Sequence, residues 1–328
     1  MAALQEANVG HALAYGSDRW TAEFEDRMRD LFGAAVEPFL VWGGTGANVM
    51  ALASMLGPAQ SVLCARSAHI NIDETGAPER ILGAKLIGLA DAEGKLVPDQ
   101  IVEQAQSLGD MHRAQPGVLS ITQSSELGTV YSPDEVAALC DTAHRHGMSV
   151  HMDGARLANA VATAGGTRSA LRSMTIDAGV DVVTFGATKN GLMYGESVVY
   201  LNDRHSIAAP FIRKQVTQLP SKMRFVAAQF NAILHDDLWI TLAASANNMA
   251  TRLYHATSDI AGLRYDHAPA VNSLFARLPR DLIEELRAWC FFWDWDTPSN
   301  QIRWMTAWDT TPADVDHFAA GLRQLLAP

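Results

Sequence analysis

Short apolar segments alternate with longer segments of helical periodicity along most of this chain, and this alternation constrains its fold more than any other feature. Helical patterns at 21–33, 47–56, 72–82, 98–108 and 133–146 lie between or before the apolar segments. The segments with strand character are 36–42, 61–65, 85–89, 118–122, 149–153, 181–185 and 197–201. Such alternation is typical of βαβ units, which build a mostly parallel sheet with helices on both faces. The sequence therefore predicts an α/β fold whose ligands bind at the carboxyl ends of the strands.

The pattern changes after residue 202, where two long helical segments, 207–218 and 223–259, follow one another without a strand. The rest of the chain alternates strand and helix patterns on a smaller scale. We therefore predict a large domain at 1–235 and a small C-terminal α/β domain at 236–328 that includes the connecting helix. The stretches "WCFFWDWD" and "RWMTAWD" alternate like strands packed on one face, so we expect their aromatic side chains in a core.

The composition, with 48% hydrophobic and 19% charged residues, is that of an ordinary globular protein. A formal net charge of −11, without a basic block, argues against nucleic acid or an anionic membrane as the main partner. Cys64, Cys140 and Cys290 lie far apart in apolar contexts, which is typical of buried, reduced thiols. Because no leader pattern opens the sequence and no apolar run is long enough to span a bilayer, we expect a cytoplasmic protein.

One predicted strand runs directly into a lysine. In "VDVVTFGATKNG" the apolar segment 181–185 is followed by Lys189, whose neighbours are small or polar. Lysine is among the residues least often buried, and small neighbours leave its amine room to meet a ligand. A turn that carries a surface lysine is the simpler interpretation of this stretch by itself.

Three further strand ends carry polar residues. The "GGTG" run 43–46 precedes a helical pattern, where free backbone N–H groups favour a phosphate, although a tight turn explains it equally well. His69 follows another strand in "SAHI". Asp153 ends the strand of "SVHMDGAR", either as a helix cap or as the partner of a cationic ring nitrogen. Together with Lys189, these features describe a site for pyridoxal phosphate, in which the lysine amine forms a Schiff base and the aspartate pairs with the pyridine nitrogen.

The chain resembles the low-specificity L-threonine aldolases, a family of the aspartate-aminotransferase-like (fold type I) pyridoxal-phosphate superfamily. The resemblance runs in order from about residue 13 to about residue 325 and is carried by "YGSDRWT", "GGTGANVMAL", "AHINIDETGAPE", "GKLVPDQI", "GTVYSPDEV", "HGMSVHMDGARLANA", "GVDVVTFGATKNG" and "SKMRF". It implies cleavage of L-threonine, L-allo-threonine or related L-β-hydroxy-α-amino acids such as phenylserine to glycine and an aldehyde. It also implies a homo-oligomer, a dimer of dimers, with shared active sites.

The resemblance assigns site residues one by one. Lys189 is the implied Schiff-base lysine, Asp153 the pyridinium partner, and His69 the residue that stacks on the ring and can serve proton transfer from the β-hydroxyl. Gly44 and Thr45 are implied to bind the phosphate, Arg156 and Arg303 the substrate carboxylate. Arg224 matches a residue that reaches a phosphate across a subunit interface, with Lys222 as a helper; surface ion pairs are the alternative for these cations.

Two segments depart from the family pattern. Members begin with a segment containing a Ser-Asp-Asn/Thr motif whose serine also contacts the substrate carboxylate, and this sequence opens past that motif. Two explanations stay open: the start codon is assigned too late in the sequence, or the site lacks that serine. Where many members carry a second active-site histidine, the chain reads "TQSSELGTV", so that Gln123, Ser124 or Ser125 replaces it and the general base stays open.

Other activities of the same fold are β-elimination and racemisation, and a catalytically impaired subunit that binds the cofactor is a third alternative, because a shared fold does not fix the reaction. We expect no metal site. His144 and His146 end an amphipathic helix without a carboxylate at ligand spacing, so a surface helix end is the favoured interpretation.

Overall fold

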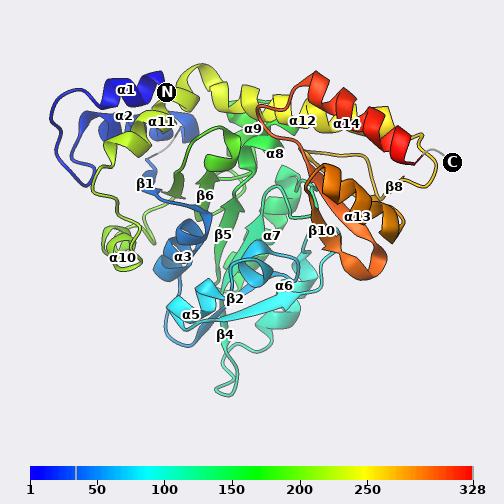
Figure 1. Cartoon of the computed structure of the whole chain (residues 1–328). Helices are drawn as coiled ribbons and strands as arrows, with labels where there is room; N and C mark the ends of the chain where they lie inside the picture. Colours follow the sequence, from blue (N-terminus) through cyan, green and yellow to red (C-terminus); the bar gives the residue numbers. More distant parts are fainter. Residues whose placement is uncertain (34, 327–328) are drawn as a thin grey trace.

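The computed structural model describes residues 1–33 and 35–326. Within them, seven strands form one sheet in the order β1-β7-β6-β5-β4-β2-β3 (Figure 1). The strands are β1 (Glu37–Val41), β2 (Gln60–Ala65), β3 (Lys85–Leu89), β4 (Gln115–Thr122), β5 (Ser149–Gly154), β6 (Val182–Gly186) and β7 (Glu196–Tyr200). β3, β2, β4, β5 and β6 pair in parallel, whereas β7 is antiparallel to both β6 and β1. The predicted mostly parallel α/β sheet is confirmed.

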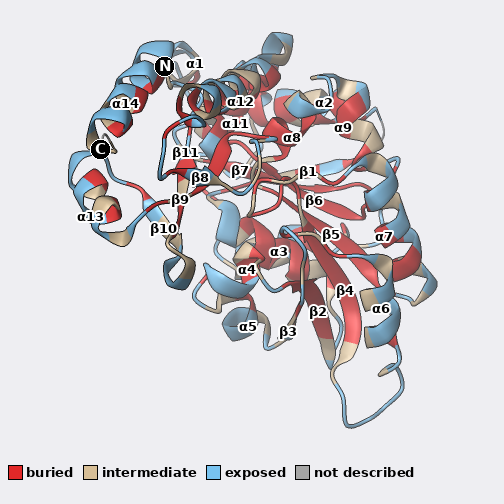
Figure 2. Ribbon diagram, turned by 90° about the vertical axis from the view of Figure 1, so that its right-hand side faces the viewer, coloured by how far each residue is buried: buried red, intermediate tan, exposed pale blue. Residues whose placement is uncertain are grey.

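Helices cover both faces of the sheet. Figure 2 shows α3 and α5 on one side and α6 and α7 on the other, with the strands between them buried. The helices of this part are α1 (Ala2–Ala7), α2 (Arg19–Phe32), α3 (Gly44–Met55), α4 (His69–Ile72), α5 (Ala77–Leu82), α6 (Pro98–Ala105), α7 (Pro133–Arg145), α8 (Leu157–Thr163), α9 (Arg168–Ser173), α10 (Ala209–Gln215) and α11 (Arg224–Leu234). α7 illustrates why they begin where they do: Ser132 Oγ accepts from Glu135 N–H, Glu135 bonds back to Ser132 N–H, and Pro133 occupies the first position.

The remaining chain forms a second, antiparallel sheet of four strands in the order β10-β11-β9-β8. Its elements are α12 (Leu238–Thr257), β8 (Arg264–Tyr265), β9 (Ser273–Arg277), α13 (Arg280–Trp289), β10 (Trp293–Asp296), β11 (Gln301–Met305) and α14 (Pro312–Leu325). α12 spans the molecule between the two sheets (Figure 1) and contributes to two separate apolar clusters, with Trp239 in the first and Leu253 in the second. The division into domains at 1–235 and 236–328 stays a prediction, and residues 327 and 328 lie outside the described residues.

Several predicted details are wrong. The helical pattern 223–259 is interrupted, because Asp236 and Asp237 have φ angles of 51° and 53° and separate α11 from α12. The pattern 72–82 is two helices, α4 and α5, and the "GGTG" run forms the first turn of α3. Cys290 is exposed, whereas Cys64 and Cys140 are buried as expected. In the described part of the chain, no helix combines the length and apolarity needed to cross a membrane.

His144 lies in the last turn of α7 and is partly exposed, as predicted for a surface helix end, but its imidazole also has a specific partner. Its Nε2 lies 2.9 Å from Asp181 Oδ2, and that buried carboxylate also accepts from Val150 N–H and Asn202 Nδ2. His144 therefore fastens the end of α7 to the start of the segment that leads into β6. Among residues 1–33 and 35–326, no cluster of three or more His, Cys, Asp or Glu side chains has the arrangement of a metal site.

Candidate active site

A cavity of about 260 Å³ opens at the carboxyl ends of the central strands. Its walls come from the start of α3, from α4, from the ends of β4 and β5, from the turn after β6 and from β11. The lining residues are Gly44, Asn48, His69, Asp73, Glu74, Thr122, Glu126, Asp153, Ala155, Arg156, Lys189 and Arg303. The position agrees with the rule that parallel sheets bind ligands beyond the carboxyl ends of their strands.

Lys189 reaches this cavity from a tight turn after β6 that is anchored on both sides. Ala187 N–H donates to the buried Glu196 carboxylate at 2.6 Å, and Asn190 Nδ2 donates to Trp239 O at 2.8 Å. Gly186 is required here, because a Cβ at this position would collide with the backbone of Ala155. The Lys189 side chain is open to the cavity. Burial of its amine by the surrounding protein lowers the pKa of that amine, and the nearby Arg156 lowers it further. A lysine with a lowered pKa is a better nucleophile at neutral pH.

Asp153 lies at the bottom of the cavity, at the end of β5. Its Oδ1 accepts from Ala155 N–H at 2.9 Å and its Oδ2 from Asn48 Nδ2 at 2.9 Å. Burial raises the pKa of this carboxyl, but the hydrogen bonds and the facing charges outweigh burial, so the pKa lies below its usual value. Asn48 is itself fixed by Thr184 Oγ1, which donates to its Oδ1 at 3.1 Å. Asp153 is therefore a buried anion held in one orientation.

His69 begins α4 and forms the opposite wall. Its Nδ1 lies 3.1 Å from Oε1 of Glu74, which also accepts from Asn48 Nδ2 at 3.0 Å. The bond to Glu74 raises the pKa of His69, against the effect of burial. The His69 backbone N–H donates to Glu126 Oε1 at 2.8 Å. A chain of polar groups thus runs from Asp153 through Asn48 and Glu74 to His69.

Arg156 and Arg303 bring two guanidinium groups to the same cavity. Within residues 1–33 and 35–326, neither side chain has a hydrogen bond or an ion pair. Arg303 lies over the Trp295 ring, with its Cζ 4.7 Å from the ring centroid. Burial and the neighbouring Arg156 lower the pKa of Arg303 to about 10. Two partly buried cations without a direct ion-pair partner can bind an anion, and their planar groups suit a carboxylate.

The remaining predicted residues lie elsewhere. Thr45 is exposed in the first turn of α3, next to Gly44. Arg224 does not line the cavity of its own chain: its Nη1 donates to Gly10 O at 3.2 Å, and its guanidinium lies near Trp20 and Phe225. Lys222 is exposed at the surface.

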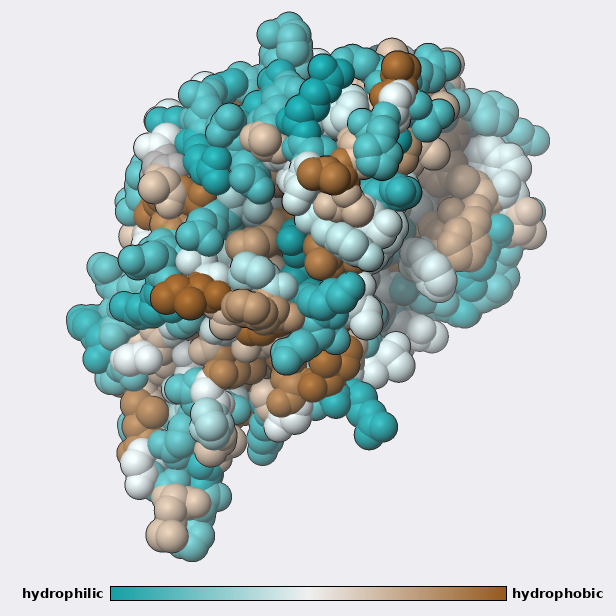
Figure 3. Space-filling model, turned by 90° about the vertical axis from the view of Figure 1, so that its left-hand side faces the viewer, coloured by the Kyte–Doolittle hydropathy of each residue, from teal (hydrophilic) through white to brown (hydrophobic). Residues whose placement is uncertain are grey.

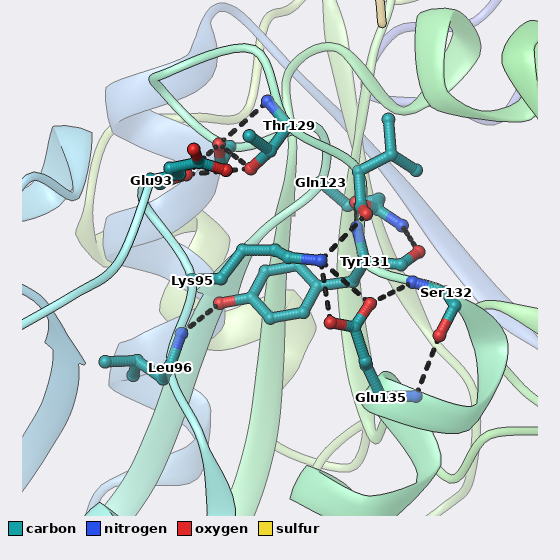
Figure 4. A network of polar contacts seen from close by, with 10 residues as sticks. Glu93, Lys95, Leu96, Gln123, Thr129, Tyr131, Ser132 and Glu135 are labelled. Atoms are coloured by element: carbon teal, nitrogen blue, oxygen red, sulfur yellow. Dashed lines mark hydrogen bonds and ion pairs between the residues drawn. The ribbon is translucent and has the colours of Figure 1, made fainter. Parts of the chain in front are cut away.

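The three residues predicted to replace a histidine are not in the cavity either. Gln123 is engaged with the backbone of Tyr131, through Nε2 at 2.8 Å and Oε1 at 3.0 Å (Figure 4). Ser125 Oγ lies 2.7 Å from Thr129 Oγ1, and Ser124 is buried. The next residue, Glu126, lines the cavity instead. Glu126 is thus the residue of this segment that lines the cavity, and the correspondence of Gln123, Ser124 or Ser125 to the family histidine stays a prediction.

Known proteins are similar to this chain over nearly its whole length. A model of the β-eliminating lyase family matches residues 1–278. A low specificity L-threonine aldolase of a Pseudomonas species is 40% identical over 329 residues, which cover 99% of this chain and 94% of the relative. The chain belongs to the low specificity L-threonine aldolases of the β-eliminating lyase family. A second such aldolase, from Pseudomonas aeruginosa, is 39% identical over 99% of this chain and 93% of its own length. The structure of a threonine aldolase from Leishmania major superimposes with a TM-score of 0.90 at 28% identity, covering 99% of this chain and 94% of that one.

This family uses pyridoxal 5'-phosphate, and the cavity fits that cofactor. The first N–H groups of α3 have no acceptor within the helix, and the positions of Gly43 and Gly44 have open space where a Cβ would point, so a phosphate can approach them. Asp153 suits a protonated ring nitrogen, and Lys189 suits an aldehyde carbon. Six lining residues were not predicted from the sequence: Asn48, Asp73, Glu74, Thr122, Glu126 and Ala155. Trp295, which lies under Arg303, was not predicted either. Glu74 stands within a quoted family motif, which is the one signal that could have marked it.

Proposed function

We propose that this protein is a pyridoxal-phosphate-dependent aldolase that cleaves L-threonine, L-allo-threonine or related L-β-hydroxy-α-amino acids to glycine and an aldehyde. The observation that carries the proposal is the pair of unpaired guanidinium groups, Arg156 and Arg303, in the same cavity as Lys189 and Asp153. A cofactor site with a separate site for a carboxylate is what an amino-acid substrate requires. The two Pseudomonas relatives are named for this activity, and the similarity extends over nearly their whole length.

When bound, pyridoxal phosphate supplies an aldehyde that links to amines and a ring that accepts electrons. In the proposal, Lys189 holds the cofactor until the substrate amine displaces it, and Asp153 keeps the ring nitrogen protonated. Gly44 and Thr45 offer their N–H groups to the phosphate, and His69 covers the ring. His69 is also one candidate for the group that receives the β-hydroxyl proton.

Arg156 and Arg303 set the reacting geometry. With the substrate amine at the cofactor and the carboxylate on the two guanidinium groups, rotation about the bond from nitrogen to Cα is fixed. A bound cofactor would take up the electrons of the Cα–Cβ bond, and the role of the two arginines would be to hold that bond in the orientation that this transfer needs. Without this clamp, loss of the α-proton or of a β-substituent competes, and those are the reactions of racemases and β-eliminating lyases.

We also propose a cytoplasmic homo-oligomer, a dimer of dimers, with shared active sites. Exposed apolar side chains support an interface: Trp42 and Tyr15 are 45% and 52% exposed, Ile207 and Phe211 81% and 71%. Figure 3 views the side that carries α10, α3 and α5 in Figure 1 and shows brown patches there among hydrophilic groups. Arg224, outside its own cavity, is in this proposal a phosphate ligand of a neighbouring subunit, and Lys222 assists it.

The test is glycine formation from L-threonine and from L-phenylserine by the protein supplied with pyridoxal phosphate. Glycine from either substrate, with the matching aldehyde in equal amount, is expected. A 2-oxo acid without glycine would point to β-elimination, and no product with a normal cofactor spectrum would point to an impaired subunit. Lys189→Ala is expected to lose both the visible absorption of the bound cofactor and glycine formation; full turnover by this variant would refute the assignment of Lys189.

A further inference from the structure

Glu126 presents a carboxyl group to the cavity for which the roles above leave no task. It belongs to the segment between β4 and α7 and is only 7% exposed. Gln123 and Ser125, earlier in that segment, are engaged with Tyr131 and Thr129 and are not among the lining residues. Figure 4 shows Gln123 beside Tyr131. Glu126 is therefore the polar side chain that this segment contributes to the site.

The two oxygens of Glu126 have different surroundings. Oε1 accepts from His69 N–H and from Thr122 Oγ1, both at 2.8 Å. Oε2 is buried and has no hydrogen-bond partner among the residues that the structure describes. Within the same residues, Glu126 forms no ion pair. One oxygen thus fixes the orientation of the carboxyl group, while the other retains its capacity to accept a proton from a ligand.

The charged and titratable groups around Glu126 come from several elements. Asp153 on β5 opposes its ionisation, Arg156 after β5 and Arg303 on β11 favour it, and Cys64 on β2 and Tyr131 also lie within electrostatic range. Burial is the largest effect, and it raises the pKa of Glu126 to about 7 against the two hydrogen bonds. A group with a pKa near the working pH can both take up and release protons.

His69 is already engaged with another carboxylate. Its Nδ1 lies 3.1 Å from Glu74 Oε1, and this bond raises the pKa of the imidazole. Glu126, by contrast, keeps one carboxyl oxygen without a partner among the described residues. The backbone N–H of His69 donates to the Glu126 carboxyl group. This carboxyl group therefore lies beside His69, the residue that we assign to cover the cofactor ring.

We propose that Glu126 accepts the proton of the substrate's β-hydroxyl group when the Cα–Cβ bond breaks. The inference rests on the proposed aldol cleavage. The O–H proton moves to the Glu126 carboxylate, and the O–H electron pair forms the carbonyl bond of the aldehyde. The electron pair of the Cα–Cβ bond moves to Cα and is stabilised by the cofactor. Glu126 then returns its proton to solvent, and Cα takes one from solvent to complete glycine, so that atoms and charges balance.

The test compares Glu126→Gln with the holoenzyme and with Glu93→Gln, which removes the same charge from an exposed residue of a neighbouring loop. Three quantities are measured. The first is cleavage of L-threonine across about 1.5 pH units on either side of the expected pKa of about 7. The others are exchange of the glycine α-protons with D₂O, followed by NMR, and the infrared titration of carboxyl groups in the cofactor-free protein. Glycine exchange needs the cofactor, Lys189 and the carboxylate clamp but no β-hydroxyl, so it separates the proposed role from a structural one.

Glu126→Gln is expected to lower kcat for cleavage by about 100-fold or more, to remove the fall of kcat/KM below pH 7 and to leave glycine exchange unchanged. The infrared difference between wild type and Glu126→Gln should show a carboxyl group that titrates near pH 7, and Glu93→Gln should behave as wild type. Equal cleavage by Glu126→Gln and wild type, or a parallel loss of cleavage and exchange, would overturn the inference alone. Absence of glycine from the wild type would overturn the aldolase proposal, and this inference with it.

Glu126→Asp provides a second variant if the amide destabilises the protein. It keeps a carboxyl group that is shorter by one methylene, so kcat should fall while the fall of kcat/KM at acidic pH persists. Disappearance of that acidic limb in Glu126→Asp would contradict the assignment of the limb to residue 126.

Discussion

The two arginines of this cavity, Arg156 and Arg303, favour the binding of an anion and lower the stability of the fold. Arg156 and Arg303 raise each other's electrostatic energy, and neither forms an ion pair among the described residues, although Glu126 lies within electrostatic range of both. Proteins usually pair buried charges, because an unpaired buried charge is costly. Trp295 offsets part of this cost by holding the Arg303 guanidinium on its face. The arrangement makes sense when a ligand supplies the missing negative charge.

Replacement of Arg303 by lysine tests this arrangement. Lysine cannot lie flat on Trp295 or bind a carboxylate through two parallel hydrogen bonds, so a loss of about 1.5–3 kcal/mol of binding is expected. KM for L-threonine should rise roughly 10- to 100-fold, while the absorption of the bound cofactor stays the same. Arg252→Lys is the control, since Arg252 pairs with Asp316 on the surface at 2.7 Å. An unchanged KM in Arg303→Lys would exclude this arginine from the carboxylate site.

The raised pKa of Glu126 also predicts how stability depends on pH. The folded protein holds the Glu126 proton up to about pH 7, whereas the unfolded chain releases it near the usual glutamate pKa. The free energy of unfolding therefore falls as the pH rises through this interval, and the full penalty is present above it. Glu126→Gln should make the cofactor-free protein more stable by on the order of 2 kcal/mol at pH 8 and equally stable at pH 4, measured by urea unfolding. Lower stability of the variant at pH 8 would contradict the buried, unpaired state of Glu126.

At the level of elements, strands and strand ends were predictable and side-chain partnerships were not. β5 and β6 are short apolar runs, and parallel pairing places their ends at one edge of the sheet, so Asp153 and Lys189 could be assigned to one site. Glu126 and Trp295 depend on a turn and on a hairpin whose geometry follows from tertiary contacts. The expectation that the aromatic stretches form a core holds for Trp304, 4% exposed, and fails for Trp293, 63% exposed.

The break between α11 and α12 was missed for a related reason. In the sequence, aspartate at 236 and 237 does not interrupt the helical pattern. The structure shows that the backbone of both residues lies in the left-handed region. This break permits α12 to leave the direction of α11 and to cross towards the second sheet (Figure 1). Asp237 also pairs with Arg168 at 3.2 Å, which fixes the break against α9.

Two substitutions at Asp236 test whether the break between α11 and α12 requires a positive φ angle at this residue. Proline fixes φ near −65° and cannot adopt the observed 51°, so Asp236→Pro should lower the free energy of unfolding by about 3 kcal/mol or more. Glycine adopts positive φ without strain, so Asp236→Gly should change stability by about 1 kcal/mol or less. The Asp236 side chain is 88% exposed, which limits other effects of the substitution. Equal stability of the two variants would show that the backbone at 236 is free to rearrange.

At the scale of the whole molecule, one chain supplies most of the groups that the chemistry needs, but not all that the proposal assigns. The cavity holds the lysine, the buried aspartate and the carboxylate clamp. Arg224, proposed as a phosphate ligand, bonds to Gly10 O near the surface of its own chain. If the proposal of shared sites is correct, assembly and activity depend on one another, and a change on the apolar face near α10 should affect both.

Phe211→Asp tests this dependence. Phe211 lies on α10 and is 71% exposed, and a carboxylate buried in an apolar interface without a partner weakens association by at least about tenfold. Sedimentation velocity should show an oligomer for the wild type and a smaller species for Phe211→Asp, whose specific activity rises with protein concentration. Met111→Asp is the control, because Met111 is 90% exposed and belongs to the segment between α6 and β4. In Figure 1 these two elements lie away from α10. A fully active monomer would exclude shared sites and would require the phosphate to be bound by α3 and its own chain alone.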